Sequence, residues 1–173
     1  MKNRAAVVAI LAAAFAGAAS AQEVFSSSDI NVPITDETTV STTLYCGEPY
    51  RTLTDVNVLI NITHTYDSDL DIVLIPPDQL AYVHLCSDVG ANGLNMTNTV
   101  FDEQAPTSIV SAVAPMTGSF RPEGGPINWA GTIPLPPTAL ATLGSLNGRL
   151  PTGHWTLMVD DDAAQDVGVL LDW

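Results

Sequence analysis

Apolar and polar residues alternate from Val56 to His64. An alternation with a period of two over nine residues, rich in β-branched side chains, is typical of a β-strand with one buried face. His64 falls on the apolar face of this predicted strand. We therefore expect His64 to be a buried histidine with a backbone partner, and not a general base.

Shorter strand patterns follow along the rest of the chain. We expect further strands at 39–45, 70–75, 82–86, 155–159 and 169–173, and a short one at 107–113. Residues 87–99 and 115–137 are rich in glycine, asparagine or proline, which favours loops, and one short helical turn is expected within 135–146. Many short strands without a long amphipathic helix predict an all-β fold, either a β-sandwich or a jelly roll.

The first 21 residues have the pattern of a secretory signal peptide. Lys2 and Arg4 precede an apolar run from Val7 to Ala19, and the small residues Ala19-Ser20-Ala21 form a cleavage site. The run is shorter than the about 20 residues that a membrane-crossing helix needs. We expect cleavage after Ala21, secretion to the extracellular space without membrane insertion, and one domain over residues 22–173.

Charge is unevenly divided between these two parts. All 19 acidic residues follow Ala21, with only Arg51, Arg121 and Arg149 to oppose them, so the mature chain carries a net charge of −16. A polyanion without basic patches is not expected to bind nucleic acid through phosphates or an anionic membrane surface. The acidic excess is typical of solubility, salt tolerance or bound cations.

Cys46 and Cys86 belong to the part of the chain that we expect outside the cell. Oxidising compartments favour pairing, so we expect a disulfide that closes a loop of about 40 residues. Two separate buried thiols are the alternative. The histidines His64, His84 and His154 do not stand at zinc-ligand spacing, so these cysteines lack partners for a metal site.

Acidic residues gather at predicted turns. Asp67, Asp69 and Asp71 alternate around the start of a strand, and in an extended chain their carboxylates share one face. Their repulsion calls for a cation, and Ca²⁺ prefers about six to eight oxygen ligands. Further candidate ligands from other loops are Asp88, Asp102, Glu103, Asp160, Asp161, Asp162 and Asp166. The alternative is a solvated acidic turn, and the segment is not an EF-hand because Ile72 replaces the required glycine.

No local catalytic motif is present. The sequence lacks a G-x-S-x-G nucleophile elbow, and we assign no catalytic residue. Among the tryptophans, Trp155 and Trp173 lie in strand patterns and are expected in the core. Trp129 lies in a predicted loop and is a candidate for stacking on a sugar.

Five segments, in the same order, resemble the P domain (P/Homo B domain) of kexin- and furin-like proprotein convertases and their bacterial relatives. The first is Ile62-Thr-His-Thr-Tyr-Asp-Ser-Asp-Leu-Asp-Ile-Val-Leu74, followed by Ser87-Asp-Val-Gly90, residues 101–109, residues 114–124, and Gly153-His-Trp-Thr-Leu-Met-Val-Asp-Asp-Asp162 with residues 166–173. Together they span about residues 30–173.

The resemblance implies a jelly-roll β-sandwich, similar to galactose-binding domains, with no catalytic residues of its own. In convertases this domain packs on a subtilisin-like catalytic domain and supports its folding, stability and calcium dependence. The 152 residues after Ala21 are too few to hold that catalytic domain as well. We therefore expect a secreted module that binds calcium and stabilises or docks with a partner, either a subtilisin-like catalytic domain or another extracellular protein.

Two alternatives stay open. The chain is a fragment of a larger exported serine peptidase, or it is an extracellular module that binds glycans or proteins through the loops around Trp129. The sequence also departs from the family pattern: residues 132–152 form a longer connection, and the family's last strand continues past the position of Trp173, which predicts a truncated strand here. The two cysteines do not belong to the family core.

Overall fold

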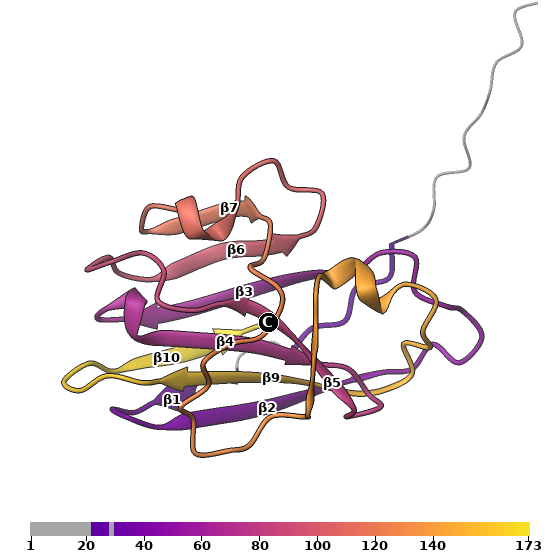
Figure 1. The fold of residues 1–173 in the computed structure, drawn as a ribbon, viewed down its shortest axis with the longest axis horizontal. Coiled ribbons are helices and arrows are strands. Elements are labelled where there is room, and N and C mark those ends of the chain that lie inside the picture. The colour runs from indigo at the N-terminus through magenta and orange to yellow at the C-terminus, as the bar shows by residue number, and fades with distance from the viewer. Residues whose placement is uncertain (1–21, 28–29) are drawn as a thin grey trace, which may run out of the picture.

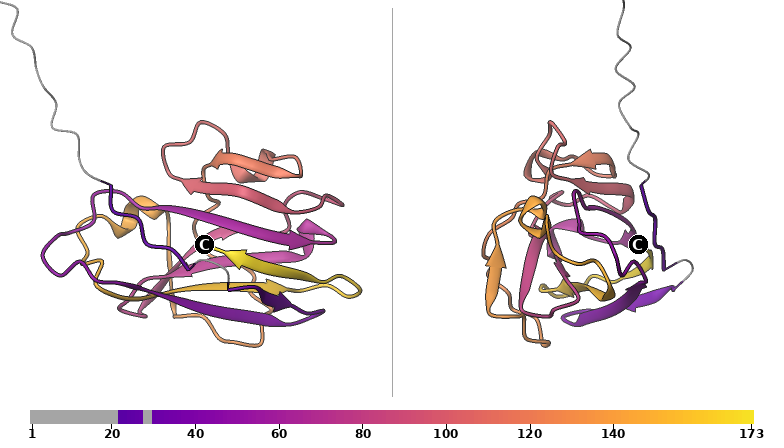
Figure 2. Two further views of the ribbon diagram at one scale, coloured as in Figure 1. Left: turned by 180° about the vertical axis from the view of Figure 1, so that it is seen from behind. Right: turned by 90° about the vertical axis from the view of Figure 1, so that its right-hand side faces the viewer.

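The computed structural model describes residues 22–27 and 30–173, so the predicted signal peptide lies outside the described residues. Two five-stranded β-sheets lie face to face (Figures 1 and 2). The fold is therefore a β-sandwich, as the sequence predicts. The finer jelly-roll description stays a prediction.

The first sheet has the strand order β1-β10-β3-β6-β7. Its strands are β1 (Val32–Ile34), β3 (Asn57–His64), β6 (Met96–Asp102), β7 (Met116–Phe120) and β10 (Gly168–Asp172). Neighbouring strands are antiparallel except β6 and β7, which are parallel. The last strand, β10, lies between β1 and β3 and is paired on both sides.

The second sheet has the strand order β2-β9-β4-β5-β8. Its strands are β2 (Thr39–Cys46), β4 (Leu70–Ile75), β5 (Ala81–Cys86), β8 (Thr138–Leu140) and β9 (Gly153–Asp161). Here only β5 and β8 run parallel. The longest strand, β9, lies between β2 and β4 and pairs with both along most of its length.

The main core fills the space between the two sheets. In β3, the side chains of Val58, Ile60, Ile62 and His64 are buried, as the alternating pattern predicts. Side chains at alternate positions of a strand point to the same face, so these residues meet the inward residues of the second sheet. This inward set includes Leu70, Ile72, Leu74, Leu157 and Val159.

The outer face of the second sheet is also covered. Residues 121–137 form the orange loop that crosses this face in Figure 1. Beneath the loop, Val73, Ile75, Tyr82 and Met158 form a second apolar cluster. This cover explains why all six residues of β4 are buried, although the strand belongs to a two-sided sheet.

The helices of the described residues are three short 3-10 turns: η1 (Asp67–Asp69), η2 (Ile109–Ser111) and η3 (Leu143–Leu146). The last one confirms the predicted helical turn. Among residues 22–27 and 30–173, the structure contains no helix that is both long enough and apolar enough to cross a membrane.

Three local predictions were wrong for identifiable reasons. Residues 115–137 were expected to be a loop, yet β7 occupies Met116–Phe120, where three of the five residues are exposed and leave no alternating pattern. Residues 87–99 were expected to be loop, yet β6 begins at Met96. A bulge between Met96 and Thr99, with Asn98 at a φ of +50°, interrupts the period-two pattern that would have revealed the strand. Residues 107–113 were expected to be a strand but contain η2, because only Ile109 of η2 is buried in the core.

The predicted disulfide between Cys46 and Cys86 is also wrong, since both cysteines are buried free thiols. Cys46 lies opposite Gly153 at one end of β9, whereas Cys86 lies level with Ile72 and Val159. The two cysteines are therefore six residues, or about 20 Å, apart along the strands and three strand spacings, or about 14 Å, apart across the sheet. A disulfide needs Cα atoms within about 7 Å.

Candidate metal centre

Acidic side chains occupy one end of the outer face of the second sheet. Asp71 in β4 lies directly opposite Asp160 in β9. Their sequence neighbours Ile72 and Val159 point into the core, so both aspartates point to the opposite face of the sheet. Like charges directly opposite each other destabilise a strand pair, and this pairing therefore needs a compensating group.

Three carboxylates converge at this point. Asp71, Asp88 and Asp162 each contribute one carboxylate oxygen, and the three oxygens lie within 4.8 Å of one another. Asp88 comes from the loop after β5, where its φ of +52° lies in the left-handed region. Asp162 follows the last residue of β9, and its N–H donates a hydrogen bond to the carbonyl oxygen of Asp69 (2.9 Å). Three separate segments therefore form the group.

Asp71 is the buried member of this group. Its exposed fraction is 2%, whereas Asp88 and Asp162 are exposed. Within the described part of the chain, its carboxylate accepts no hydrogen bond. Burial, and after it the nearby negative charges of Asp162 and Asp88, together raise the pKa of Asp71 to about 7. An unpaired buried carboxylate is costly, and either a proton or a cation removes that cost.

Asp160 and Asp69 border the three-carboxylate group without joining it. The Asp160 Oδ1 atom accepts a hydrogen bond from the Thr39 hydroxyl (2.5 Å). Asp69 is buried, and burial together with the charges of Asp166 and Asp161 raises its pKa. Of the two, Asp160 adds negative charge next to Asp71 and Asp162.

Glu123 is a functional candidate that the sequence did not reveal. Its Oε1 atom accepts a hydrogen bond from the Ser87 N–H (2.7 Å), immediately before Asp88. Its own N–H donates to the Leu85 carbonyl (3.1 Å). Glu123 thus fixes the start of the loop that carries Asp88. Its sequence context, Arg-Pro-Glu-Gly-Gly, gave only a turn signal, because this contact joins residues 36 positions apart.

His84 lies beside Glu123, with 3.8 Å between its Nε2 atom and the Glu123 Oε1 atom. The ring is buried, and neither nitrogen has a hydrogen-bond partner among the described residues. Burial lowers the pKa of His84, although the charge of Glu123 acts in the opposite direction. His84 is not one of the three converging residues.

A second acidic group lies inside the sandwich. The His64 Nε2 atom is 3.3 Å from the Asp161 Oδ2 atom, and both side chains are fully buried. The other ring nitrogen lies 2.9 Å from the Tyr66 carbonyl, which provides the backbone partner predicted for His64. Burial raises the pKa of Asp161, while the neighbouring His64 lowers it. This pair joins the ends of β3 and β9 in the interior.

The prediction that Asp67, Asp69 and Asp71 share one face was wrong. Residues 67–69 form a 3-10 turn instead of an extended chain, so the period of two does not apply to them. The Asp67 Oδ1 atom accepts a hydrogen bond from the Asn95 N–H (2.8 Å), and its Oδ2 atom is buried without a partner among the described residues. Burial raises the pKa of Asp67. Of the three aspartates, only Asp71 belongs to the converging group.

Asp102 and Glu103 do not reach the site either. Asp102 pairs with Asn57 at the start of β3, whereas His64 at the other end of β3 contacts Asp161, the sequence neighbour of Asp162. An eight-residue strand separates these ends by on the order of 20 Å. Asp102 accepts a hydrogen bond from the Gln104 N–H (2.7 Å), and Glu103 accepts one from the Leu143 N–H (3.0 Å). Both carboxylates serve local turns.

Trp129 is partly buried. Its ring packs against the second apolar cluster, and its Nε1–H donates a hydrogen bond to the Ile133 carbonyl (2.8 Å). The loop therefore uses Trp129 to attach itself to the sheet. Trp155 and Trp173 are buried, as predicted.

The donor set at Asp71, Asp88 and Asp162 consists of carboxylate oxygens alone. Such ligands suit hard cations such as Ca²⁺, whereas zinc and copper favour imidazole and thiolate. Comparison with protein-family models, curated proteins and solved structures gave no match to this chain. The resemblance to the P domain remains a prediction from the sequence segments.

Proposed function

We propose that this chain is a secreted, non-catalytic β-sandwich module that binds Ca²⁺ and acts by stabilising or docking with a partner protein. The observation that carries the calcium assignment is the convergence of Asp71, Asp88 and Asp162 within 4.8 Å, with Asp71 buried and unpaired. The partner role follows from the resemblance to the P domain, and its candidates are a subtilisin-like catalytic domain or another extracellular protein.

Calcium at this position joins three parts of the chain. Its ligands come from β4, from the loop after β5 and from the end of β9. A cation bound by these carboxylates removes their mutual repulsion. The unfolded chain has no such site, because the three residues are far apart there. A ligand that binds only the native state raises the free energy of unfolding.

The surroundings of His64 and His154 support a non-catalytic role. His64 faces Asp161 inside the sandwich, and His154 packs its ring against Tyr45 with 5.1 Å between centroids. A general base needs hydrogen-bond reach to a reacting group. These two histidines are engaged in structural contacts instead.

The calcium proposal is tested by thermal unfolding of the purified mature chain in EGTA and in excess Ca²⁺. We expect calcium to raise the melting temperature of the native sequence. The Asp71→Asn variant keeps the size of the side chain but removes the buried charge, so it should fold in EGTA at least as stably as the native chain and show little or no calcium shift.

Asp102→Asn is the matched control. It makes the same chemical change at a carboxylate that the structure places at the other end of β3, so its calcium shift should equal that of the native chain. Equal melting temperatures of the native chain in EGTA and in calcium would refute the calcium proposal. A shift that survives in Asp71→Asn would place the ion elsewhere.

A further inference from the structure

The three carboxylates would leave part of a calcium ion's coordination sphere open. Bound through one oxygen each, the converging carboxylates supply three ligands, whereas Ca²⁺ takes about six to eight. Asp71 is buried without a partner and marks the protein side of the site, while Asp88 and Asp162 are exposed. The open positions therefore face outwards, where oxygen atoms of water or of a ligand complete the sphere.

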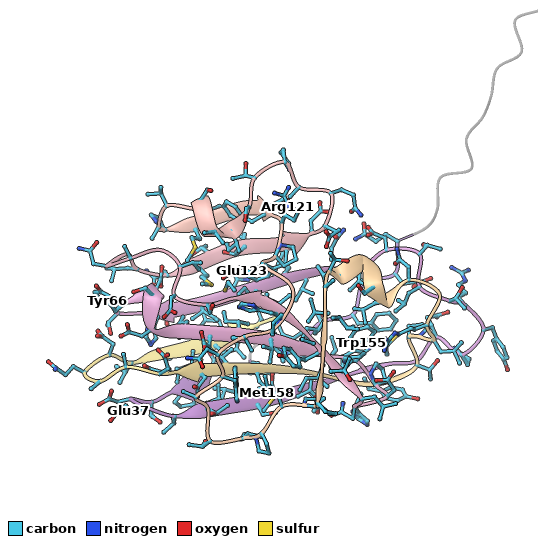
Figure 3. The ribbon with its side chains drawn as sticks, viewed as in Figure 1. Glu37, Tyr66, Arg121, Glu123, Trp155 and Met158 are labelled. Carbon is cyan, nitrogen blue, oxygen red and sulfur yellow. The ribbon has the colours of Figure 1, made fainter. Side chains whose placement is uncertain are left out.

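A groove of about 680 Å³ begins at the same place, because Asp88 lines it as well. Its lining comes from the loop that carries Asp88 and from Val110 in η2 with residues 112–114 that follow η2. Tyr66 and Glu123, labelled in Figure 3, line it from two further segments. The volume is sufficient for one or two sugar rings.

The lining of the groove combines polar and apolar groups. Hydroxyl and amide groups come from Ser68, Ser87 and Asn92. Among the apolar and aromatic lining residues, Val113 is 82% exposed and Tyr66 is 37% exposed. A sugar ring also combines polar and apolar groups. Its hydroxyl groups form hydrogen bonds, and its C–H faces pack on aromatic rings.

The charge of the site selects against anionic ligands. One Ca²⁺ with three carboxylates leaves a net charge of −1, and Glu123 lies in the groove nearby. A carboxylate or sulfate on the ligand would meet this negative potential at close range. A pair of neutral hydroxyl oxygens does not meet this repulsion and fills two open coordination positions.

We propose that the groove beside Asp88 binds a neutral sugar, with two adjacent hydroxyl groups of the sugar coordinating the calcium ion held by Asp71, Asp88 and Asp162, and with Tyr66 packing on the ring. This inference rests on the calcium site proposed above. It places glycan binding at a different surface from the loop around Trp129, where the sequence suggested it.

The test is native gel electrophoresis of the mature chain through gels that contain a soluble polysaccharide. The neutral probes are mannan, galactan and laminarin, and the anionic probe is carboxymethyl cellulose. We expect at least one neutral polysaccharide to retard the protein in Ca²⁺ gels, no retardation in EGTA gels, and none by carboxymethyl cellulose. Each gel includes a second acidic protein as a mobility standard.

Tyr66→Ala separates sugar binding from calcium binding. It should weaken retardation by about tenfold in apparent Kd and keep the calcium-induced rise in melting temperature, because Tyr66 is not among the three converging residues. Tyr50→Ala is the matched control, since Tyr50 is 95% exposed and does not line the groove. This control should bind like the native chain.

Each of the remaining outcomes would overturn the sugar site, the calcium site or both. A normal calcium shift without retardation by any neutral probe would overturn the sugar site and leave the calcium proposal standing. Retardation that persists in EGTA, or that is stronger with carboxymethyl cellulose, would also overturn it. Absence of both the calcium shift and retardation would remove both proposals together.

Discussion

At the scale of single residues, Asp71 combines burial with a negatively charged neighbourhood. Its carboxylate has no hydrogen-bond donor among the described residues, and its pKa rises to about 7, chiefly through burial. The ordinary value is 3.8. Between these two pH values, the native chain holds a proton at Asp71 that the unfolded chain has already released.

This difference predicts how stability depends on pH in EGTA. The contribution of Asp71 is fully present below about pH 4 and is lost as the pH rises through about 7, since stability falls with pH wherever the native state binds more protons. We expect the melting temperature in EGTA to fall less between pH 5.5 and pH 8 in Asp71→Asn than in the native chain. Parallel curves for the two proteins would contradict the assignment.

Calcium reverses the direction of this effect. The ion must displace the proton from Asp71, and metal affinity therefore increases with pH. The calcium-induced rise in melting temperature of the native chain should be larger at pH 8 than at pH 5.5, which the same set of melting curves measures.

At the scale of elements, the glycines at 124 and 125 determine how the covering loop attaches to β5 and β8. The Gly124 N–H donates to the His84 carbonyl and the Gly125 N–H donates to the Leu140 carbonyl, each at 2.9 Å. Both glycines have a positive φ, of +68° and +72°. They differ in their surroundings: a Cβ atom at Gly124 would collide with the Ala141 carbonyl, whereas the space at Gly125 is open.

These two positions form a matched pair for substitution. Gly125→Ala should cost about 1 kcal/mol through backbone strain alone. Gly124→Ala adds the collision with backbone atoms and should cost on the order of 3 kcal/mol. Urea unfolding of both variants measures the difference, and equal losses would show that the loop does not contact β8 as described.

Strands were predicted correctly where the alternation of apolar and polar residues in the sequence matches the burial of those residues in the fold. The strand over residues 57–64 keeps one face buried along its whole length, so its alternation was sufficient to identify it. The strand over 96–102 has a bulge that shifts its pattern, and the strand over 116–120 has exposed residues at three of its five positions. These strands form because each pairs with a neighbouring strand of the sheet. Pairing between segments that are distant in the sequence leaves no hydrophobic pattern within either segment.

At the scale of the whole molecule, the assembly of the second sheet sets the distance between the cysteines. Cys46 and Cys86 are both in strands of this sheet, on its first and fourth strands in spatial order. Their separation is therefore a property of strand order and register. Both thiols are buried, and burial raises the pKa of Cys86 well above its ordinary value.

This arrangement predicts the reactivity of the thiols towards Ellman's reagent. We expect two reactive thiols per chain in guanidinium chloride without reductant, and almost none in the native protein, because a thiol reacts as an accessible thiolate. A chain treated with dithiothreitol and then desalted gives the reference value of two. Fewer thiols in the untreated, denatured chain would indicate the disulfide that the structure excludes.

The sequence by itself determined the all-β class and most strands of the sandwich, because an alternating pattern and turn residues act within a few positions along the chain. It also determined that acidic residues concentrate at turns. Only the tertiary structure decided which of them meet: Asp71, Asp88 and Asp162 converge, Asp67 turns inwards, and Asp102 lies at the other end of β3. The physical reason is that strand order and register bring distant carboxylates together, and neither is encoded in the local spacing of residues.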